Sequence, residues 1–310
     1  MKRAAVVVGV MALVASLAVT AAAVPHFSAW EPAQKLDEIA GNSSEINTPF
    51  LDGCPIESPD GLSLYLASDR PNGLGGLDIW VAHRPTADAS FGAPVNLGEP
   101  VNSAADDLCP TPIRGGGLLF VSREALPGSC GMGDIYFTQF NSRHGWSEPE
   151  HLACGPDGPN SALDELGPSY VEVGGRALLH FSSGPDIYVS EKLEDGSFGP
   201  AAPVAELNGA ATDIQPNIRK DGRELVFASN DSGRPGARGG FDIYVATRKS
   251  VDDPWSVPVN LGDAMNTVNN ETRPSFSWAA QTLYFGRAPG PEGSTDIYVT
   301  TRERLSGPTA

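Results

Sequence analysis

A tripeptide of aspartate, isoleucine and an aromatic residue occurs five times in this chain of 310 residues. The copies are Asp78-Ile79-Trp80, Asp134-Ile135-Tyr136, Asp186-Ile187-Tyr188, Asp242-Ile243-Tyr244 and Asp296-Ile297-Tyr298. Successive copies are 56, 52, 56 and 54 residues apart. A nearly constant period of this length is typical of a repeat architecture, in which each repeat is a small unit stacked on its neighbours.

Other features keep the same phase. A proline precedes each tripeptide by about 23 residues on average, at Pro55, Pro110, Pro168, Pro216 and Pro274. An apolar run lies between the two landmarks, at 62–68, 117–122, 177–182, 224–229 and 282–287. An aromatic-proline-leucine segment then follows the tripeptide in the first four units. Each unit thus contains four short strands, which predicts an all-β, five-bladed β-propeller with four-stranded blades.

The two chain ends support closure of the ring. The fifth unit lacks its fourth strand, whereas Trp30, Pro32 and Leu36 supply the missing pattern near the N-terminus. We therefore expect a strand at about 28–37 to complete the last blade and remove an open sheet edge. The blades are expected at about 45–103, 104–161, 162–210, 211–267 and 268–304, within a single domain at 24–310.

The first 23 residues have the pattern of a secretory signal peptide: Lys2 and Arg3, an apolar stretch at 4–20, and Ala21-Ala22-Ala23 as a cleavage site. Export to the periplasm or beyond is expected, with no membrane insertion after cleavage. The formal net charge of −17 would become −19 without Lys2 and Arg3. Such acidity opposes binding to nucleic acid. A monomer is expected.

The glycine-rich stretch at 70–77 does not read as a phosphate-binding loop, because it leads into a strand and lacks the Lys-Ser/Thr pair. It reads as a tight loop between the second and third strands. The aspartate that opens each third strand is expected to serve the fold by accepting backbone N–H bonds from that loop.

Residues 55–80 combine Ser-Pro-Asp-Gly, Leu-Tyr-Leu-Ala-Ser, Ser-Asp-Arg-Pro and Asp-Ile-Trp. This pattern resembles the TolB-type, WD-like propeller repeat, and the resemblance extends over about residues 28–304. It implies the propeller fold and export, but it says little about function. The separate N-terminal domain of TolB has no counterpart here, so the resemblance does not extend to TolB's partners.

An acidic residue stands three positions before each repeat proline, at Asp52, Asp107, Glu165, Asp213 and Glu271. The inner strands would bring these five acids toward the axis on one face. One interpretation is a cation site, with Ca²⁺ as the candidate ligand and no other cofactor. The favoured interpretation is structural, with each acid holding a neighbouring loop. A third is a glycoside hydrolase that uses two or three axial carboxylates.

Three features break the symmetry of the repeat. Cys130 and Cys154 flank neighbouring strands of the second blade, which predicts a disulfide, and Cys54 and Cys109 occupy equivalent positions where a second bond is conceivable. The loop between Ser182 and Asp186 is short, which suggests a notch for a partner. His180 aligns with the phenylalanine of the second strand in other units and reads as a core residue.

These observations favour a non-catalytic scaffold that binds an envelope or extracellular protein through its glycine-rich loop face. Two alternatives stay open: a carbohydrate-active or metal-dependent hydrolase that uses axial carboxylates, and a glycan-binding module. No histidine pair with metal-ligand spacing and no Gly-x-Ser-x-Gly motif is present in the sequence, and no metal can be named.

Overall fold

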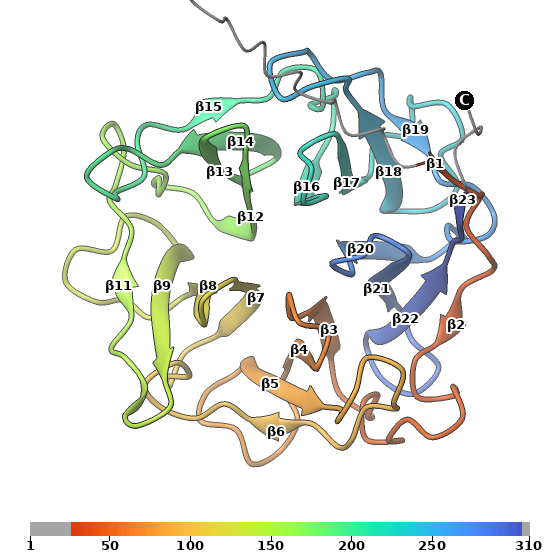
Figure 1. Cartoon of the computed structure of the whole chain (residues 1–310), viewed down its shortest axis with the longest axis horizontal. Coiled ribbons are helices and arrows are strands. Elements are labelled where there is room, and N and C mark those ends of the chain that lie inside the picture. Colours follow the sequence, from red (N-terminus) through yellow and green to blue (C-terminus); the bar gives the residue numbers. More distant parts are fainter. Residues whose placement is uncertain (1–25, 306–310) are drawn as a thin grey trace, which may run out of the picture.

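The computed structural model describes residues 26–305, so the expected signal peptide at 1–23 lies outside the described residues. Five antiparallel sheets surround a central axis (Figure 1). In each sheet one strand lies nearest the axis and the other strands lie progressively farther out. Over residues 26–305 there is no helix of the length and apolar character that a membrane crossing requires. The five-bladed propeller predicted from the repeat is confirmed.

The first blade comprises β3 (Asp52–Glu57), β4 (Ser63–Ser68), β5 (Asp78–His83) and β6 (Val95–Asn96). The second comprises β7 (Asp107–Ile113), β8 (Gly117–Ser122), β9 (Asp134–Asn141), β10 (Gly145–Trp146) and β11 (Glu150–His151). The third comprises β12 (Glu165–Val173), β13 (Arg176–Ser183), β14 (Asp186–Glu191) and β15 (Ala202–Pro203). The fourth comprises β16 (Asp213–Ile218), β17 (Glu224–Ser229), β18 (Asp242–Thr247) and β19 (Val259–Asn260). The fifth comprises β20 (Asn270–Phe276), β21 (Thr282–Ala288), β22 (Asp296–Thr301) and the N-terminal β2 (Gln34–Lys35).

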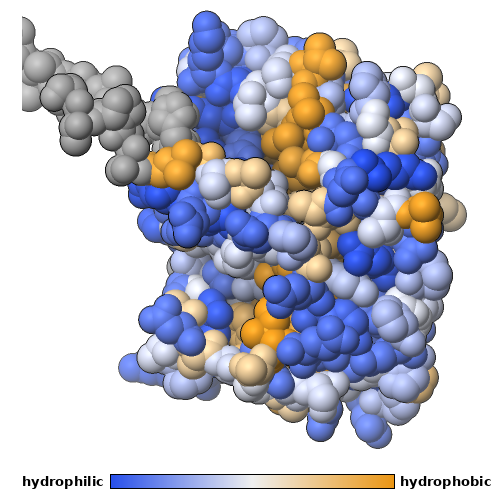
Figure 2. All heavy atoms as spheres, turned by 90° about the vertical axis from the view of Figure 1, so that its right-hand side faces the viewer, coloured by the Kyte–Doolittle hydropathy of each residue, from blue (hydrophilic) through white to orange (hydrophobic). Residues whose placement is uncertain are grey.

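The ring is closed by pairing between the two ends of the chain. Strand β2 lies antiparallel to β22, and β1 (His26–Phe27) pairs with β23 (Arg304–Leu305), so the first and last colours of the sequence meet in Figure 1. Leu36 is only 2% exposed. Figure 2 shows this side of the ring, where hydrophilic residues cover most of the surface and apolar residues form narrow strips. The predicted closing strand is confirmed.

An aromatic pair fixes the register inside most blades. The phenylalanine of the second strand stacks on the tyrosine of the third in four blades, with ring centroids 5.8–6.2 Å apart: Phe120–Tyr136, Phe181–Tyr188, Phe227–Tyr244 and Phe285–Tyr298. The placement of His180 at this position was wrong, because Phe181 is the residue that pairs with Tyr188. His180 is buried one position earlier, and desolvation lowers its pKa to about 3.

Every inner strand contains a bulge just before the repeat proline. The register shifts there in all five inner strands. In each, the residue before the proline has a positive φ of 50–62°: Cys54, Cys109, Gly167, Gln215 and Arg273. We call these five residues the axial ring. Four of the five are not glycine, although this conformation costs a side-chain-bearing residue about 1–2 kcal/mol.

Candidate functional site

The five acids predicted at the axis lie inside the protein. Asp52, Asp107, Glu165, Asp213 and Glu271 are each at most 1% exposed. In each blade the acid accepts hydrogen bonds from the residue four positions earlier, as Asp52 does from the N–H and hydroxyl of Thr48 at 2.6 and 2.7 Å. The carboxylates therefore hold the loop that enters the inner strand.

The five acids differ in their cationic partners. Arg70 pairs with Asp52, Arg234 with Asp213 at 2.9 Å, and Arg287 with Glu271 at 2.7 Å. Asp107 and Glu165 form no ion pair with the described residues, and each has one buried oxygen without a hydrogen-bond partner. Burial raises the pKa of Asp107 to about 6 and also raises the pKa of Glu165, in both cases against the effect of serine hydrogen bonds.

The aspartates of the third strands close the adjoining loops. Asp78 accepts N–H bonds from Leu74 and Gly75, and Asp134, Asp242 and Asp296 accept bonds from their own loops in the same way. Asp186 differs because its loop is only the turn Gly184–Pro185, across which Ser183 pairs directly with Asp186. Leu163 of a neighbouring loop lies next to Gly184, whereas Pro185 is exposed.

A cavity of about 510 Å³ lies at the opposite ends of the inner strands. We call it the axial pocket. It is lined by residues from all five inner strands or the turns that follow them, among them Glu57, Thr111, Tyr170, Arg219 and Trp278. The pocket is therefore the place where the five blades contribute side chains to one cavity.

One repeat position supplies five different side chains to this pocket. Four residues after the repeat prolines stand Pro59, Arg114, Glu172, Lys220 and Trp278, and all five line the cavity. The sequence analysis missed these residues, although a signal was present. In a chain whose blades are otherwise alike, a position where every blade differs is a candidate for binding or catalysis, since the fold does not require any one residue there.

Glu57 is the most shielded carboxyl of the pocket. Its side chain is 7% exposed, and its Oε2 accepts hydrogen bonds from Arg84 at 2.8 Å and from the hydroxyl of Tyr284 at 2.9 Å. Burial raises the pKa of Glu57 despite these two bonds, which favour the carboxylate. A carboxyl with a raised pKa beside a cavity is suited to act as a general acid.

The other pocket side chains form a mixed polar and aromatic surface. Glu172 is exposed and accepts a hydrogen bond from the hydroxyl of Tyr170 at 2.6 Å. Trp278 lies between two cations, with Arg114 at 4.5 Å and Lys220 at 5.3 Å from its ring centroid. Aromatic faces and charged groups that converge on a cavity are typical of ligand sites.

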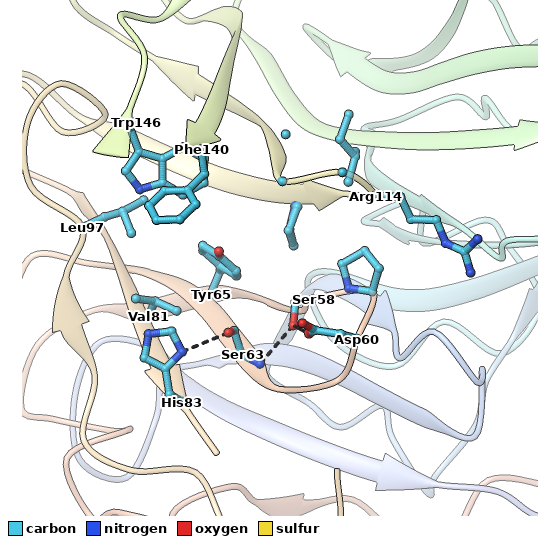
Figure 3. A pocket seen from close by; sticks show the side chains of 16 residues that line it. Ser58, Asp60, Ser63, Tyr65, Val81, His83, Leu97, Arg114, Phe140 and Trp146 are labelled. Carbon is cyan, nitrogen blue, oxygen red and sulfur yellow. Dashed lines mark hydrogen bonds between the residues drawn. The ribbon is translucent and has the colours of Figure 1, made fainter. Parts of the chain in front are cut away.

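A second cavity of about 510 Å³ adjoins the first and shares Pro59, Pro112, Ile113 and Arg114 with it. It follows the boundary between the first two blades toward the outside. Figure 3 shows Phe140 and Trp146 from the second blade facing Tyr65 and His83 from the first. We call the two adjoining cavities together the groove; it extends from the axis toward the rim and is lined by apolar and aromatic side chains together with polar and charged ones.

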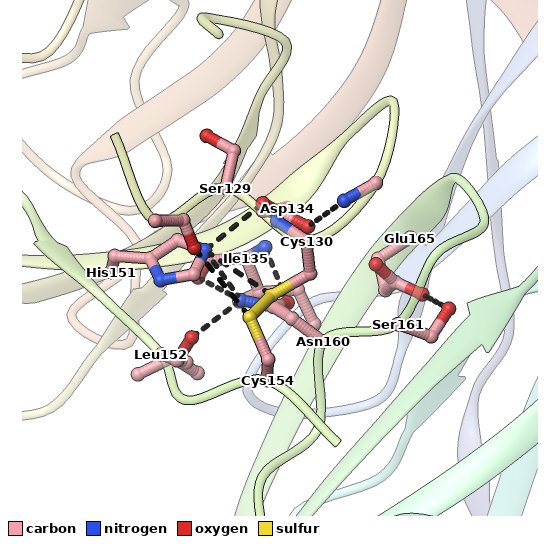
Figure 4. Close-up of a disulfide and its surroundings, with 12 residues drawn as sticks. Ser129, Cys130, Asp134, Ile135, His151, Leu152, Cys154, Asn160, Ser161 and Glu165 are labelled. Carbon is pink, nitrogen blue, oxygen red and sulfur yellow. Dashed lines mark hydrogen bonds and ion pairs between the residues drawn. A yellow bond between two sulfur atoms is a disulfide. The ribbon is translucent and has the colours of Figure 1, made fainter. Parts of the chain in front are cut away.

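Cys130 and Cys154 form the predicted disulfide, with their Cα atoms 5.8 Å apart. Asp134 accepts a hydrogen bond from the Cys130 N–H and lies 3.0 Å from His151 Nε2 (Figure 4). Among the described residues, Cys130, His151 and Cys154 are the one group with metal-ligand geometry, but the disulfide occupies both sulfurs. This corner of the second blade therefore reads as a covalent staple.

Replacing Cys130 and Cys154 by serine is expected to lower the free energy of unfolding by about 2–4 kcal/mol, because the bond restrains a long loop in the unfolded chain. Urea denaturation of the double variant and the parent measures this difference. Ala125→Ser, at an exposed position of the same loop, is the matched control and should change stability little. Equal stability of double variant and parent would show that the bond does not form or does not restrain the unfolded chain.

No protein-family model matches the chain, and no curated protein matches it either. Solved structures do. A thermostable family-43 glycoside hydrolase has a TM-score of 0.54 at 11% identity, covering 86% of this chain and 94% of that one. The GH43 endo-arabinanase from Bacillus licheniformis has a TM-score of 0.53 at 14% identity, covering 84% and 96%. TolB from Acinetobacter baumannii has a TM-score of 0.44 at 13% identity, covering 83% and 55%.

The expectation of a non-catalytic scaffold for a protein partner is contradicted. The similar structures include several glycoside hydrolases, which favours the carbohydrate-active alternative. The likeness between the blades was misleading, because it reflects the turns and strands that every blade needs and not the chemistry at the axis. At 11–14% identity these likenesses establish the fold, so any activity must be inferred from the side chains of this chain.

Proposed function

We propose that this protein is an exported glycoside hydrolase whose active site is the axial pocket, on a propeller built from TolB-like repeats. The observation that carries the proposal is the convergence of five different residues from one repeat position on a cavity that also holds Glu57. Export rests on the N-terminal pattern Lys2-Arg3 and its apolar stretch.

Glu57 is assigned the role of general acid. Its raised pKa keeps a proton on the side chain nearer to neutral pH than an exposed glutamate would. Tyr284 and Arg84 hold the carboxyl in place through Oε2. The proton passes to the glycosidic oxygen as the bond to the anomeric carbon breaks, so the leaving sugar departs as an alcohol.

Glu172 is assigned the role of the second carboxylate. It belongs to the third blade, and the hydroxyl of Tyr170 orients it. It either removes a proton from the attacking water or attacks the anomeric carbon itself, and the separation of the two carboxyls during catalysis decides between these routes. In both routes one water is consumed for each glycosidic bond broken. The reaction requires only carboxyls and water.

The groove suits a polymer rather than a single sugar. The aromatic rings of Trp278, Phe140 and Trp146 provide apolar faces along the path from the axis to the rim. Arg114 and Lys220 add positive charge near the axis, which favours glycans that carry carboxylate groups. A panel for testing should therefore contain both neutral and uronate-bearing polysaccharides.

The test is release of reducing ends from arabinan, xylan and polygalacturonate by residues 24–310. We expect hydrolysis of at least one of them, with kcat lowered about 10²–10⁴-fold in Glu57→Gln and in Glu172→Gln. Glu148→Gln, an exposed position outside both cavities, serves as the control and should keep full activity. Activity should also fall as pH rises through the raised pKa of Glu57. Failure of the parent on every glycan, or full activity in both pocket variants, would overturn the proposal.

A further inference from the structure

Two thiols of the axial ring lie in contact at the boundary between the first and second blades. The sulfurs of Cys54 and Cys109 are 3.0 Å apart. A disulfide bond is about 2.05 Å long, so a shift of about 1 Å would join them. Both residues have a positive φ, which turns equivalent positions of adjacent blades toward each other. The remaining cysteines of the chain are already joined, so this is the free thiol pair.

A cation lies beside these thiols. Arg273 reaches from the fifth blade across the axis, and its Nη2 donates to the carbonyl oxygens of Cys109 and Pro110 at 3.3 and 3.2 Å. Its side chain is among the fully buried ones, yet Nε and Nη1 have no hydrogen-bond partner. The described surroundings thus leave part of this buried positive charge uncompensated, which favours a negative charge nearby.

The surroundings make the two sulfurs unequal. The pKa of Cys109 is lowered by the hydrogen bond from the Cys54 thiol, by the charge of Arg273 and by a backbone N–H from Gly167, against the effect of burial. The pKa of Cys54 is raised well above its usual value by its hydrogen bond to Cys109 and by burial. One thiolate beside one thiol is the arrangement in which a nucleophile and a resolving cysteine act in sequence.

We propose that Cys54 and Cys109 form a peroxide-reactive dithiol that closes to a disulfide across the first two blades. The Cys109 thiolate attacks a peroxide oxygen, the O–O bond breaks, and the sulfenic acid of Cys109 forms with release of hydroxide. The Cys54 sulfur then attacks the Cys109 sulfur and the S–O bond breaks. The departing hydroxyl takes the Cys54 proton and leaves as water. Two thiols lose two electrons in total, and the peroxide receives them.

The burial of the pair selects the oxidant. Cys109 is fully buried and Cys54 is partly buried, so a protein oxidant cannot reach the reactive sulfur in the folded chain. Ile56 and Thr111, each two residues beyond one of the cysteines, line the axial pocket. A small peroxide can approach from that cavity, which is why hydrogen peroxide is the appropriate probe.

The experiment starts from residues 24–310 after mild phosphine reduction that leaves Cys130–Cys154 intact. Alkylation under denaturing conditions should add two labels before treatment and none after one equivalent of hydrogen peroxide. Cys54→Ser should stop at a sulfenic acid that dimedone traps, whereas Cys109→Ser should not react with dimedone. Arg273→Gln should slow oxidation at least tenfold.

Several results would overturn the proposal. One is retention of both labels after peroxide treatment. Another is equal dimedone labelling of the Cys54→Ser and Cys109→Ser variants, which would mean that neither sulfur is the favoured nucleophile. A third is a Cys54–Cys109 bond that cannot be reduced while Cys130–Cys154 survives, since that would make it a permanent structural disulfide. None of these readouts depends on glycoside hydrolysis, so the two proposals stand or fall separately.

Discussion

Asp52→Asn is expected to lower the free energy of unfolding by about 3–5 kcal/mol, because it leaves a buried arginine without its counter-charge. Asp52 is fully buried, and the side chain of its partner Arg70 is 8% exposed. Arg70 also donates to the carbonyl oxygens of Glu45 and Ile46, so it cannot swing out to water without breaking these bonds as well. Urea denaturation at pH 7 measures the loss.

Asp107→Asn at the same repeat position is expected to have the opposite sign at neutral pH. Asp107 is equally buried but has no arginine, and burial raises its pKa from 3.8 to about 6. The folded chain therefore binds more protons than the unfolded chain between these values, so this carboxyl makes stability fall as pH rises from about 4 to about 6. An asparagine has no charge to desolvate.

The free energy of unfolding of Asp107→Asn minus that of the parent should therefore increase by about 2–3 kcal/mol between pH 4 and pH 7. Paired urea titrations at the two pH values measure it. A similar loss of stability in Asp52→Asn and Asp107→Asn at pH 7 would contradict this account. It would mean that the hydrogen bonds to the loop, rather than the arginines, determine how much each buried acid contributes to the free energy of unfolding.

The fold could be predicted because every blade contains the same short sequence motifs. The Asp-Ile-aromatic tripeptide marks one strand in each unit, and the gap at the end of the fifth unit is filled by the pattern around Trp30 and Leu36. These signals are local in sequence and recur five times, so an error in one unit is corrected by the others. The assignment of His180 failed because the hairpin of β12 and β13 is longer than in the other blades, so that counting from the preceding Gly-Arg stopped one residue short of Phe181.

The site could not be predicted in the same way, because its contacts join distant parts of the chain. Glu57 acquires its environment from Tyr284, 227 residues away, and Trp278 meets cations from two other blades. The five buried acids look equivalent in sequence, yet their arginines come from a loop (Arg70 and Arg234), from strand β21 (Arg287), or are missing. Only the assembled ring shows that Asp107 and Glu165 lack a counter-charge.

At one position of the axial ring, Gly167, the neighbouring atoms leave no room for a side chain. Gly167 has a φ of +62°, and a Cβ atom there would lie 2.6 Å from the Cα of Gln215 and 2.5 Å from Nη1 of Arg273. A long side chain such as that of Arg273 can move away, but the backbone of Gln215 cannot do so without shifting the fourth blade. Glycine at this position therefore allows the inner strands to approach each other at the axis.

Gly167→Ala is accordingly expected to lower the free energy of unfolding by about 2–5 kcal/mol, the sum of a left-handed conformation and an overpacked axis. Gly98→Ala is the matched control: it has a φ of +73° with nothing within 4 Å of the added Cβ, so it should lose only the conformational part, about 1–2 kcal/mol. Thermal and urea unfolding of both variants measure the difference.

A second comparison separates the two contacts at this glycine. The comparison is between the cost of Gly167→Ala in the parent and its cost in a chain that already carries Arg273→Ala. If the clash with Arg273 dominates, most of that cost should disappear in the Arg273→Ala chain. If the backbone of Gln215 dominates, as its shielded position requires, the double variant should recover little. Equal losses in Gly167→Ala and Gly98→Ala would refute the steric argument altogether and leave only the cost of the left-handed backbone conformation.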